Sequence, residues 1–317
     1  MLARCALILV VIYSIVPAQK DVKVDSITYE NDMQWNVYPS EEPVVAFAAT
    51  GNELWYSTGQ EVNLLYMNTM KMQVFNKLGD ISASSVAAMA TDCTGVIWIG
   101  TNDGVAAGGR KGFTSHTVEN GLCDNTVTAI CPARHNKLWV GTPKGACLYQ
   151  GNKWTHYDSK NGLPGDGVND IAIDNKNRAW IGTDKGIGMF DGASWDIHDM
   201  KREMSWNNVK ALAIDRRTGK VWAAVGESDV NSYDGKEWKV YMSIKDDISC
   251  MMVDTQGRVW FGSPTGLVKF NGDNWVSDPK KLGVTASSVA QMVCDRQGNM
   301  WFGTARGVIR LANPYPF

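Results

Sequence analysis

Histidine residues are the side chains that would most readily give this chain acid–base chemistry. The sequence contains only four, at positions 116, 135, 156 and 198. Three of them occupy the same outer region in successive copies of a repeat, and periodic placement of this kind is typical of packing. The fourth lies in a short turn, and no HExxH, nucleophile elbow or P-loop is present. The sequence therefore predicts no catalytic residues, no metal site and no cofactor.

Residues 200–229 contain most of the candidate ligand contacts. Trp206 is the one Trp with no counterpart in other copies of the repeat, so its ring could stack on a sugar or another flat ligand, or form a plug packed over a channel mouth. Lys201 and Arg202 precede it, and are candidate contacts of a type that is usually solvated. Glu227 lies where the sequence reads Trp-Ala-Ala-Val-Gly-Glu-Ser-Asp instead of the usual Trp-x-Gly-Thr.

The elements that position these residues are copies of one repeat. Seven Trp residues are separated by 43, 41, 41, 42, 38 and 41 positions: Trp55, Trp98, Trp139, Trp180, Trp222, Trp260 and Trp301. The clearest copy, residues 168–198, reads as four short apolar strands bounded by turn residues. Turns of the form Asp-x-x-Gly follow the first strand, and Asp-Gly or Asn-Gly often follows the third. Copies of this length with four strands predict an all-β, seven-bladed β-propeller of four-stranded antiparallel blades.

The last copy runs from Val289 to Leu311 and lacks a fourth strand. Residues 34–38, Gln-Trp-Asn-Val-Tyr, match the fourth strand of other copies and precede the first copy. We therefore expect the N-terminal strand to complete the last blade and close the ring, which removes the exposed sheet edges.

The innermost strands should line a central channel, with small residues at their third position. Asp170 and Gln291 replace the small residue there, and Asn169 and Lys210 are polar at the preceding position. A carboxylate near the axis must be hydrated, hydrogen-bonded or paired, and Lys210 is a candidate partner for Asp170. These residues either contribute to a ligand site or stabilise a water-filled channel.

The direction of the strands predicts which rim of the propeller binds the ligand. Connections from strand two to strand three, and the longer ones from strand four to the next strand one, share one rim, here named the top rim. The short hairpins share the opposite, bottom rim. Function on such scaffolds concentrates in long, variable loops, so we expect ligands on the top rim near blades 4 to 6.

The combined motif resembles the two-component regulator propeller repeat. Trp-Ile-Gly-Thr-x-x-Gly, after Asp-x-x-Gly-x-x-Trp and before a loop such as Asn161-Gly162-Leu163-Pro164, carries the resemblance over residues 27–312. It implies a periplasmic sensor propeller of hybrid histidine kinases, which often respond to carbohydrate. Here we expect a free-standing propeller without the kinase. Trp-Phe-Gly at 260–262 and 301–303 is also similar to virginiamycin B lyase, whose type of site needs a His base near a metal.

The first 18 residues resemble a signal peptide, with Arg4 before an apolar run and Val16-Pro17-Ala18 as a cleavage site; an uncleaved anchor is the alternative. We expect residues 19–317 to form the propeller, periplasmic or extracellular, with no later membrane segment. Of seven Cys residues, six would remain, read as small buried side chains, although export permits a disulfide. The net charge of −2 argues against nucleic acid as a partner.

The sequence thus favours a ligand-binding or sensor-type propeller that recognises a carbohydrate, a small molecule or an extracytoplasmic protein, and that is not an enzyme. Two alternatives stay open. One is a propeller enzyme, a metal-assisted lyase or hydrolase using carboxylates such as Asp170 and Glu227. The other is a structural module that docks a protein on one flat face.

Overall fold

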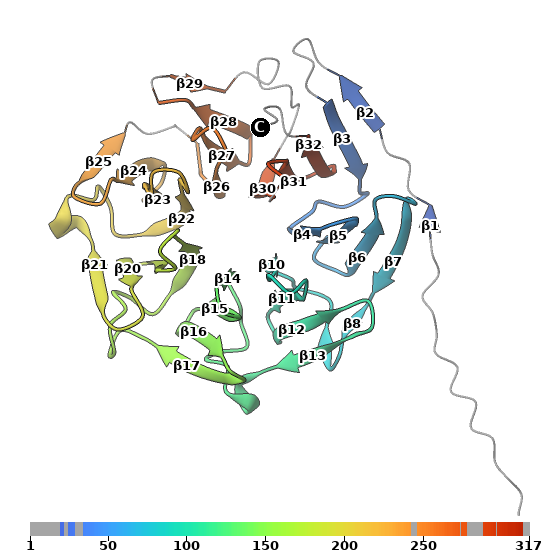
Figure 1. Cartoon of the computed structure of the whole chain (residues 1–317), viewed down its shortest axis with the longest axis horizontal. Helices are drawn as coiled ribbons and strands as arrows, with labels where there is room; N and C mark the ends of the chain where they lie inside the picture. The colour runs from blue at the N-terminus through green and yellow to red at the C-terminus, as the bar shows by residue number, and fades with distance from the viewer. Residues whose placement is uncertain are drawn as a thin grey trace, which may run out of the picture.

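The chain folds into a ring of seven small β-sheets around a central axis (Figure 1). The computed structural model describes residues 20–21, 25–28, 34–241, 246–272, 274–277, 288–295 and 297–312. The signal peptide predicted for residues 1–18 lies outside the described residues. Within the described ranges, no helix has the length and apolar character that crossing a bilayer requires.

Each sheet is one blade, with its strands hydrogen-bonded in order from the axis outward. Blades 1 to 3 contain β4 (Ala46–Thr50), β5 (Glu53–Ser57), β6 (Val62–Tyr66) and β7 (Lys71–Phe75); β10 (Ala88–Thr91), β11 (Ile97–Thr101), β12 (Gly104–Gly109) and β13 (Gly112–His116); and β14 (Ala129–Ala133), β15 (Lys137–Thr142), β16 (Gly145–Gln150) and β17 (Lys153–Tyr157). Blades 4 to 6 contain β18 (Val168–Ile173), β19 (Ala179–Thr183), β20 (Gly186–Phe190) and β21 (Trp195–His198); β22 (Val209–Ile214), β23 (Val221–Val225), β24 (Asp229–Tyr233) and β25 (Trp238–Tyr241); and β26 (Cys250–Val253), β27 (Val259–Ser263), β28 (Gly266–Phe270) and β29 (Trp275–Val276).

Blade 7 joins the two ends of the chain, as the sequence predicts. Its inner strands are β30 (Val289–Cys294), β31 (Met300–Thr304) and β32 (Gly307–Leu311), and its fourth is β3 (Gln34–Pro39). The antiparallel register of β3 and β32 places Tyr38 opposite Val308. Two further strands add to the outer edges of blades 7 and 1: β2 (Asp25–Thr28) pairs with β3, and β1 (Lys20–Asp21) pairs with β7 of blade 1.

Short elements fill the connections on the rims. A small hairpin of β8 (Lys77–Leu78) and β9 (Ile81–Ser82) follows blade 1. Two 3-10 turns, η1 (Val118–Asn120) and η2 (Met200–Arg202), follow blades 2 and 4. The Asp-x-x-Gly hairpins form as expected, because Gly95 has φ 88° and Asn177, which replaces the Gly in blade 4, has φ 63°. Asn is among the few side chains that tolerate this left-handed region.

The repeated Trp of strand two packs between neighbouring blades, which confirms its expected role. Trp55, Trp180 and Trp301 are each less than 2% exposed. Between blades 2 and 3, 4 and 5, and 5 and 6, the ring meets an aromatic residue on strand three of the next blade, with centroid separations of 5.7, 5.9 and 5.8 Å for Trp98–Tyr149, Trp180–Tyr233 and Trp222–Phe270. Aromatic pairs at such distances add to the energy of burying their large apolar surface.

Close packing at the channel explains the small residues of the inner strands. The third positions of these strands pair with a recurrent Gly of strand two, as Ala129 pairs with Gly141 and Asp170 with Gly182. A Cβ on Gly182 would lie 2.6 Å from Cγ1 of Val209 on the next blade. Only Gly lets the neighbouring strand approach this closely. In blades 4, 5 and 7 the inner strand also has a bulge just before the third position.

Candidate functional site

Three connections on the top rim share one backbone design. They run over residues 117–127, 158–168 and 199–209, between blades 2 and 3, 3 and 4, and 4 and 5. Each is closed by an Asn or Asp side chain that accepts a backbone N–H from seven residues earlier, at 2.9 Å for Asn125, 2.7 Å for Asp166 and 2.8 Å for Asn207. The repeat therefore presents the same rigid loop at three neighbouring places, and differences in side chain decide what each place can bind.

Each of the three loops is also attached to the third strand of the blade that follows it. The kind of contact differs from loop to loop. After blade 2 the fastening is a disulfide between Cys123 and Cys147, with Cα atoms 5.9 Å apart. After blade 4, Ser205 N–H donates to Asn231 Oδ1 at 2.9 Å, and Asn231 Nδ2 donates to Ser205 Oγ at 2.8 Å. The position equivalent to Asn231 in blade 4 is Gly188, which packs against the Pro164 ring.

The disulfide corrects the sequence interpretation of Cys147 as a small buried apolar side chain. Local spacing could not reveal the pairing, because Cys123 and Cys147 are 24 positions apart and meet only when the loop folds back on its blade. The thiols of Cys131, Cys250 and Cys294 are free, and all three lie on inner strands as expected. Cys93 is free and exposed on the bottom rim.

Trp206 lies on the third loop and covers the turn between β23 and β24. This turn has three residues between its paired ends, Val225 and Asp229, where Thr183 and Gly186 of blade 4 enclose two. Gly226 begins the turn at φ 61°, and a Cβ there would lie 2.6 Å from the indole Cδ1 of Trp206. The indole N–H donates to Asp229 Oδ2 at 3.2 Å. The Trp206 residue is nonetheless 53% exposed.

These contacts favour a platform over a plug. Of the two residues that hold the indole, Gly226 lies in the turn between strands two and three of blade 5 and Asp229 begins strand three, so neither lies on a channel-lining inner strand. The equivalent position is Gly165 in the loop after blade 3 and Asp124 in the loop after blade 2. Asp124 pairs with Lys144 at 2.5 Å, and its hydrogen bond with Lys144 is the largest cause of a lowered pKa of this carboxyl.

Lys210 does not pair with Asp170, which corrects the sequence expectation. Its Nζ donates to the backbone oxygen of Glu227 at 3.0 Å and contacts the carboxylate of Asp247. The reason is the bulge in the inner strands: Lys210 occupies the bulged position of β22, whereas Asp170 lies one position farther along β18. Lys210 therefore joins the exposed turn of blade 5 instead of the channel residues.

Asp170, Asn169 and Gln291 fasten inner strands to one another. Asp170 Oδ2 accepts the N–H of Leu212 in blade 5 at 2.7 Å, and Gln291 Oε1 accepts the N–H of Phe47 in blade 1 at 2.6 Å. Asn169 Nδ2 donates to the backbone oxygen of Val209 at 2.8 Å. Burial raises the pKa of Asp170 to about 6, although two backbone N–H groups act in the opposite direction. These contacts support the structural interpretation of the three residues.

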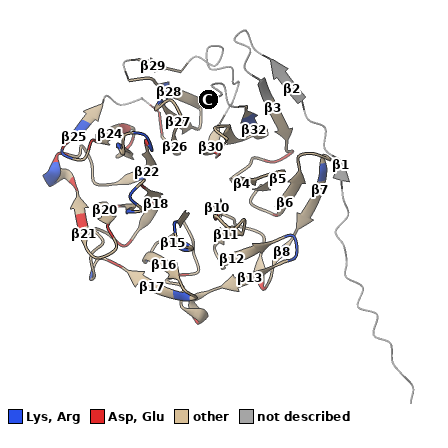
Figure 2. Cartoon of the chain, viewed as in Figure 1, with Lys and Arg blue, Asp and Glu red and all other residues tan. Residues whose placement is uncertain are grey.

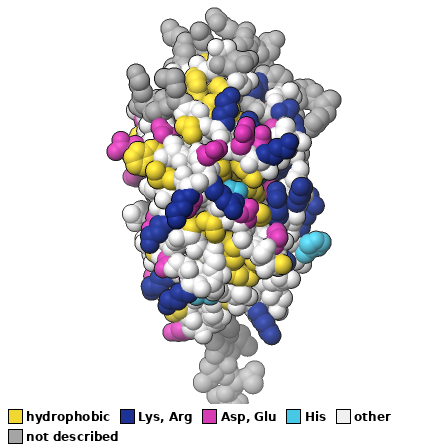
Figure 3. All heavy atoms as spheres, turned by 90° about the vertical axis from the view of Figure 1, so that its left-hand side faces the viewer, with side chains coloured by type: hydrophobic (Ala, Val, Ile, Leu, Met, Phe, Trp, Pro, Cys, Tyr) yellow, Lys and Arg dark blue, Asp and Glu magenta, His cyan; other side chains and the backbone are white. Residues whose placement is uncertain are grey.

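The predicted site residues thus separate into groups. The structure brings Trp206, Glu227 and Lys210 together around the turn of blade 5. Gln291 lies in blade 7, and Asp170 and Asn169 lie in the wall of the channel. Arg202 pairs with Asp196 on the outer strand β21 at 2.6 Å, and the Lys201 side chain is exposed. The face that includes the outer strands of blades 4 and 5 mixes both charge signs with apolar side chains (Figure 3).

Sequence reasoning missed Asp229 and Asp247, which contact Trp206 and Lys210. Asp229 begins β24 directly after the irregular turn of blade 5, and Asp247 lies in the connection to blade 6, so no repeated motif marks them. Lys and Arg are interspersed with Asp and Glu around the ring (Figure 2). Within the described ranges, no group of three or more His, Cys, Asp or Glu residues is arranged to hold a metal ion. His116 and His198 pack against the strand-two rings Trp98 and Trp180, with centroids 5.7 and 5.2 Å apart.

Comparison with known proteins supports the repeat assignment. The two-component regulator propeller model matches residues 121–144, 162–185, 243–265 and 283–306. These segments include the top-rim loop and the first two strands of blades 3 and 4. No curated protein matches the sequence.

Solved structures show the same fold at low sequence identity. The extracellular domain of a putative hybrid two-component system from B. thetaiotaomicron superposes with a TM-score of 0.72 at 19% identity, covering 91% of this chain and 45% of that one. Virginiamycin B lyase from Staphylococcus aureus gives 0.69 at 12% identity, covering 92% and 99%. PorZ, a surface component of the type-IX secretion system of Porphyromonas gingivalis, gives 0.66 at 14%, covering 87% and 47%.

The chain spans less than half the length of the extracellular domains of putative hybrid two-component systems that it resembles. Identities below 20% carry the fold and not the ligand. The motif that sequence reading identified is nonetheless the one that the family model detects, in four of the seven blades. The chain is a seven-bladed β-propeller, and four of its blades contain segments that match the two-component regulator propeller repeat.

Proposed function

We propose that this protein is an extracytoplasmic ligand-binding domain of the sensor type, which recognises its ligand on the top rim of blade 5. The observation that carries the proposal is the half-exposed indole of Trp206, held in place by Gly226 and Asp229. Trp combines an apolar ring with a polar N–H and is enriched at interaction surfaces, so an exposed indole held in one orientation supports a recognition surface.

The surroundings of Trp206 define what kind of ligand fits. The ring offers a flat apolar face, on which a sugar or another flat molecule can stack. Glu227 and Asp229 provide carboxylate acceptors, and Lys210 provides a donor beside them. A few polar groups around an aromatic face are the usual means of fixing a small ligand's orientation. We therefore favour a carbohydrate or small polar ring over an extended apolar ligand.

Two independent facts support a location outside the cytoplasm. The Cys123–Cys147 disulfide persists only in an oxidising compartment. Two of the similar solved structures are extracellular domains of putative hybrid two-component systems. Both agree with the signal peptide expected from residues 1–18.

A thermal-shift screen with oligosaccharides and small metabolites tests the proposal, because a ligand that prefers the folded state raises its stability. Trp206→Ala should abolish the shift produced by a hit while leaving the ligand-free melting temperature nearly unchanged. Gly226→Ala should have the same effect on binding, since the new Cβ displaces the indole. Trp275→Ala, at an exposed Trp on an outer strand, is the matched control and should bind normally. Intact binding by Trp206→Ala would refute the site.

The enzyme alternative retains one supporting fact, the similarity in fold to virginiamycin B lyase. The contacts of Asp170 do not favour it, because both carboxylate oxygens accept backbone N–H groups and Glu227 lies on a different surface. Incubation with the streptogramin quinupristin and a divalent metal, followed by mass spectrometry, tests lyase activity directly. Conversion of quinupristin to a product, abolished by Asp170→Asn and by Glu227→Gln, would replace the binding proposal.

The structural alternative rests on the similarity in fold to PorZ, which its own description places in a secretion system. Crosslinking in the native envelope distinguishes it from small-ligand binding. A stable protein partner, retained by Trp206→Ala and obtained without any small-ligand hit, would favour an assembly role.

A further inference from the structure

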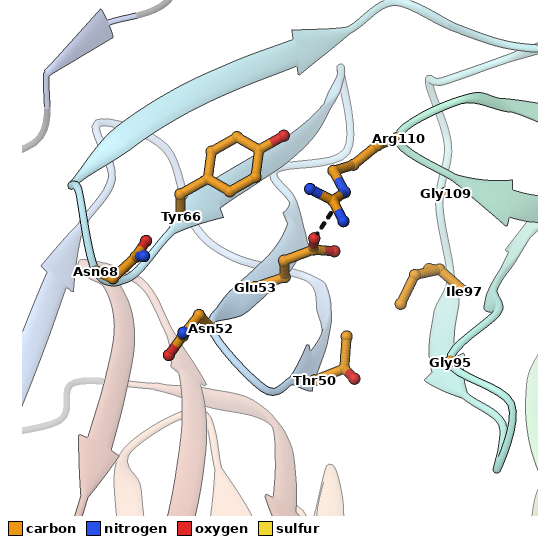
Figure 4. A pocket seen from close by; sticks show the side chains of 9 residues that line it. All are labelled: Thr50, Asn52, Glu53, Tyr66, Asn68, Gly95, Ile97, Gly109 and Arg110. Carbon is orange, nitrogen blue, oxygen red and sulfur yellow. Dashed lines mark ion pairs between the residues drawn. The ribbon is translucent and has the colours of Figure 1, made fainter.

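A cleft of about 490 Å³ opens on the bottom rim between blades 1 and 2, on the side opposite Trp206 (Figure 4). Four turns form its walls, two from each blade. The lining residues are Thr50, Asn52, Glu53, Tyr66, Asn68, Gly95, Ile97, Gly109 and Arg110. This volume lies within the range of small-molecule sites.

The cleft exists because blade 1 departs from the repeat. Its first hairpin has only Gly51 and Asn52 between the paired residues Thr50 and Glu53, whereas blade 2 has five residues, 92–96, between its strands. Between blades 3 and 4 the neighbouring bottom hairpins touch, because Arg134 N–H donates to Asn177 Oδ1 at 2.9 Å. A Cβ on Gly51 or on Gly95 would meet no atom within 4 Å.

An ion pair spans the cleft from one blade to the other. Arg110 Nε lies 2.9 Å from Glu53 Oε1, and the Arg110 side chain remains 62% exposed. The second carboxylate oxygen of Glu53 accepts the indole N–H of Trp55 at 3.1 Å. Glu53 thus performs the task that a hairpin Asp performs in other blades, from a position that opens onto the cleft. The buried Trp55 fixes its orientation, and Arg110 balances its charge.

Neutral polar groups occupy the rest of the wall. Figure 4 shows the amides of Asn52 and Asn68 on the side away from Ile97, with the Tyr66 ring reaching toward Arg110. Within the part of the chain that the structure describes, the side chains of Thr50, Asn52, Asn68 and Tyr66 make no hydrogen bond to the protein. They present donors and acceptors in similar number around one aromatic ring.

We propose that this cleft is a second binding site, and that its ligand is a neutral, hydroxyl-rich small molecule. Hydroxyl groups both donate and accept, and so match a wall that offers both. The Glu53–Arg110 pair leaves the lining without net charge, which disfavours a phosphate or another anion. Only Tyr66 and Ile97 give apolar surface, too little for a hydrophobic ligand. The site does not depend on the top-rim surface.

Titration calorimetry with sorbitol, glucose and maltose tests the proposal, with inorganic phosphate and benzoate as the contrasting anionic and apolar probes. At least one of the three polyols should bind saturably, and neither contrasting probe should. Asn68→Ala and Arg110→Ala should each weaken the polyol about tenfold, the loss expected for one hydrogen bond to a polar ligand. Trp206→Ala should leave this binding unchanged.

Lys111→Ala is the matched control, because Lys111 is exposed in the same turn as Arg110 and does not line the cleft. It should bind like the wild type. Arg110→Ala could also loosen Glu53, so the exposed and unpaired Asn68 provides the cleaner result. Absence of saturable polyol binding, preference for phosphate or benzoate, or unchanged affinity in Asn68→Ala would each overturn the proposal. Loss of polyol binding in Trp206→Ala would assign the ligand to the top rim instead.

Discussion

The carboxylate of Asp174 accepts a hydrogen bond from the indole N–H of Trp180, with 3.2 Å between Oδ2 and Nε1. Its other oxygen accepts the backbone N–H groups of Lys176 and Arg178, both at 2.9 Å. One buried side chain therefore closes the bottom hairpin and orients the ring that packs between blades. The same relationship recurs at 2.9 Å in Asp92–Trp98, Asp254–Trp260 and Asp295–Trp301.

Removing this carboxylate should destabilise the ring strongly. Asp174→Ala leaves a buried indole N–H and two backbone N–H groups without their acceptor, and frees the paired Arg178. We expect a loss of about 3 kcal/mol in the free energy of unfolding, measured with urea. Asp191→Ala removes an exposed turn carboxylate of the same blade and should leave the free energy of unfolding close to that of the wild type. Equal losses in the two variants would contradict this role.

Asp170 should give the stability a measurable dependence on pH. Burial raises its folded pKa from 3.8 to about 6, so its ionised form is disfavoured in the folded state. The wild type therefore loses stability as the pH rises through this window, and the loss is constant above it. Asp170→Asn cannot ionise, so its stability relative to the wild type should increase from about pH 4 to about pH 6 and then level off.

Urea unfolding at several pH values on both sides of that window measures the difference. Gln291→Asn is the control, because Gln291 makes the equivalent contact in blade 7 without a titratable group. Its difference from the wild type should be the same at every pH. A difference between Asp170→Asn and the wild type that does not change with pH would disprove the role of Asp170.

Reduction of the Cys123–Cys147 disulfide should loosen the loop after blade 2. The bond closes a segment of 24 positions, for which the entropic stabilisation is about 3 kcal/mol. The double variant Cys123→Ser/Cys147→Ser should show this loss in urea unfolding, and a reductant should no longer affect it. Cys93→Ser, at an exposed free thiol, should match the wild type. Equal stability of oxidised and reduced wild-type protein would contradict the prediction.

The N-terminal strand should be required for a closed ring. A chain that begins at residue 34 retains β3, whereas one that begins at residue 40 exposes the whole edge of β32. Exposed sheet edges promote aggregation, so size-exclusion chromatography should show monomer for the longer chain and aggregate for the shorter one. A monomeric shorter chain that unfolds cooperatively would show that β3 is dispensable.

The sequence predicts the ring because the information is repeated. The Trp residues from Trp55 to Trp301 and the turn glycines recur in each copy of the repeat. The strand at 34–38 supplies the fourth strand that the last copy lacks, so all three features predict the same architecture. Trp206 was identifiable for the opposite reason, since it breaks the pattern. The contacts of Lys210 were not, because a single-residue bulge displaces it from Asp170, and a bulge has no clear signature in one sequence.

The cleft beside Glu53 was also beyond sequence reasoning. It arises from the difference in length between two hairpins of adjacent blades, which matters only once they lie side by side. The sequence prediction treated the bottom rim as short turns, and so did not anticipate the space that three fewer residues leave in the first hairpin of blade 1. The pairing of Cys123 with Cys147 depends likewise on how a loop folds back.

A covalent bond in blade 3, a ring packed on a glycine in blade 4 and a pair of amide contacts in blade 5 hold the same loop in the same posture. Because these contacts are interchangeable, each loop is a module that could be transferred from one blade to another together with the residue that anchors it. Protein design could therefore change the ligand specificity one loop at a time, without disturbing the ring of blades.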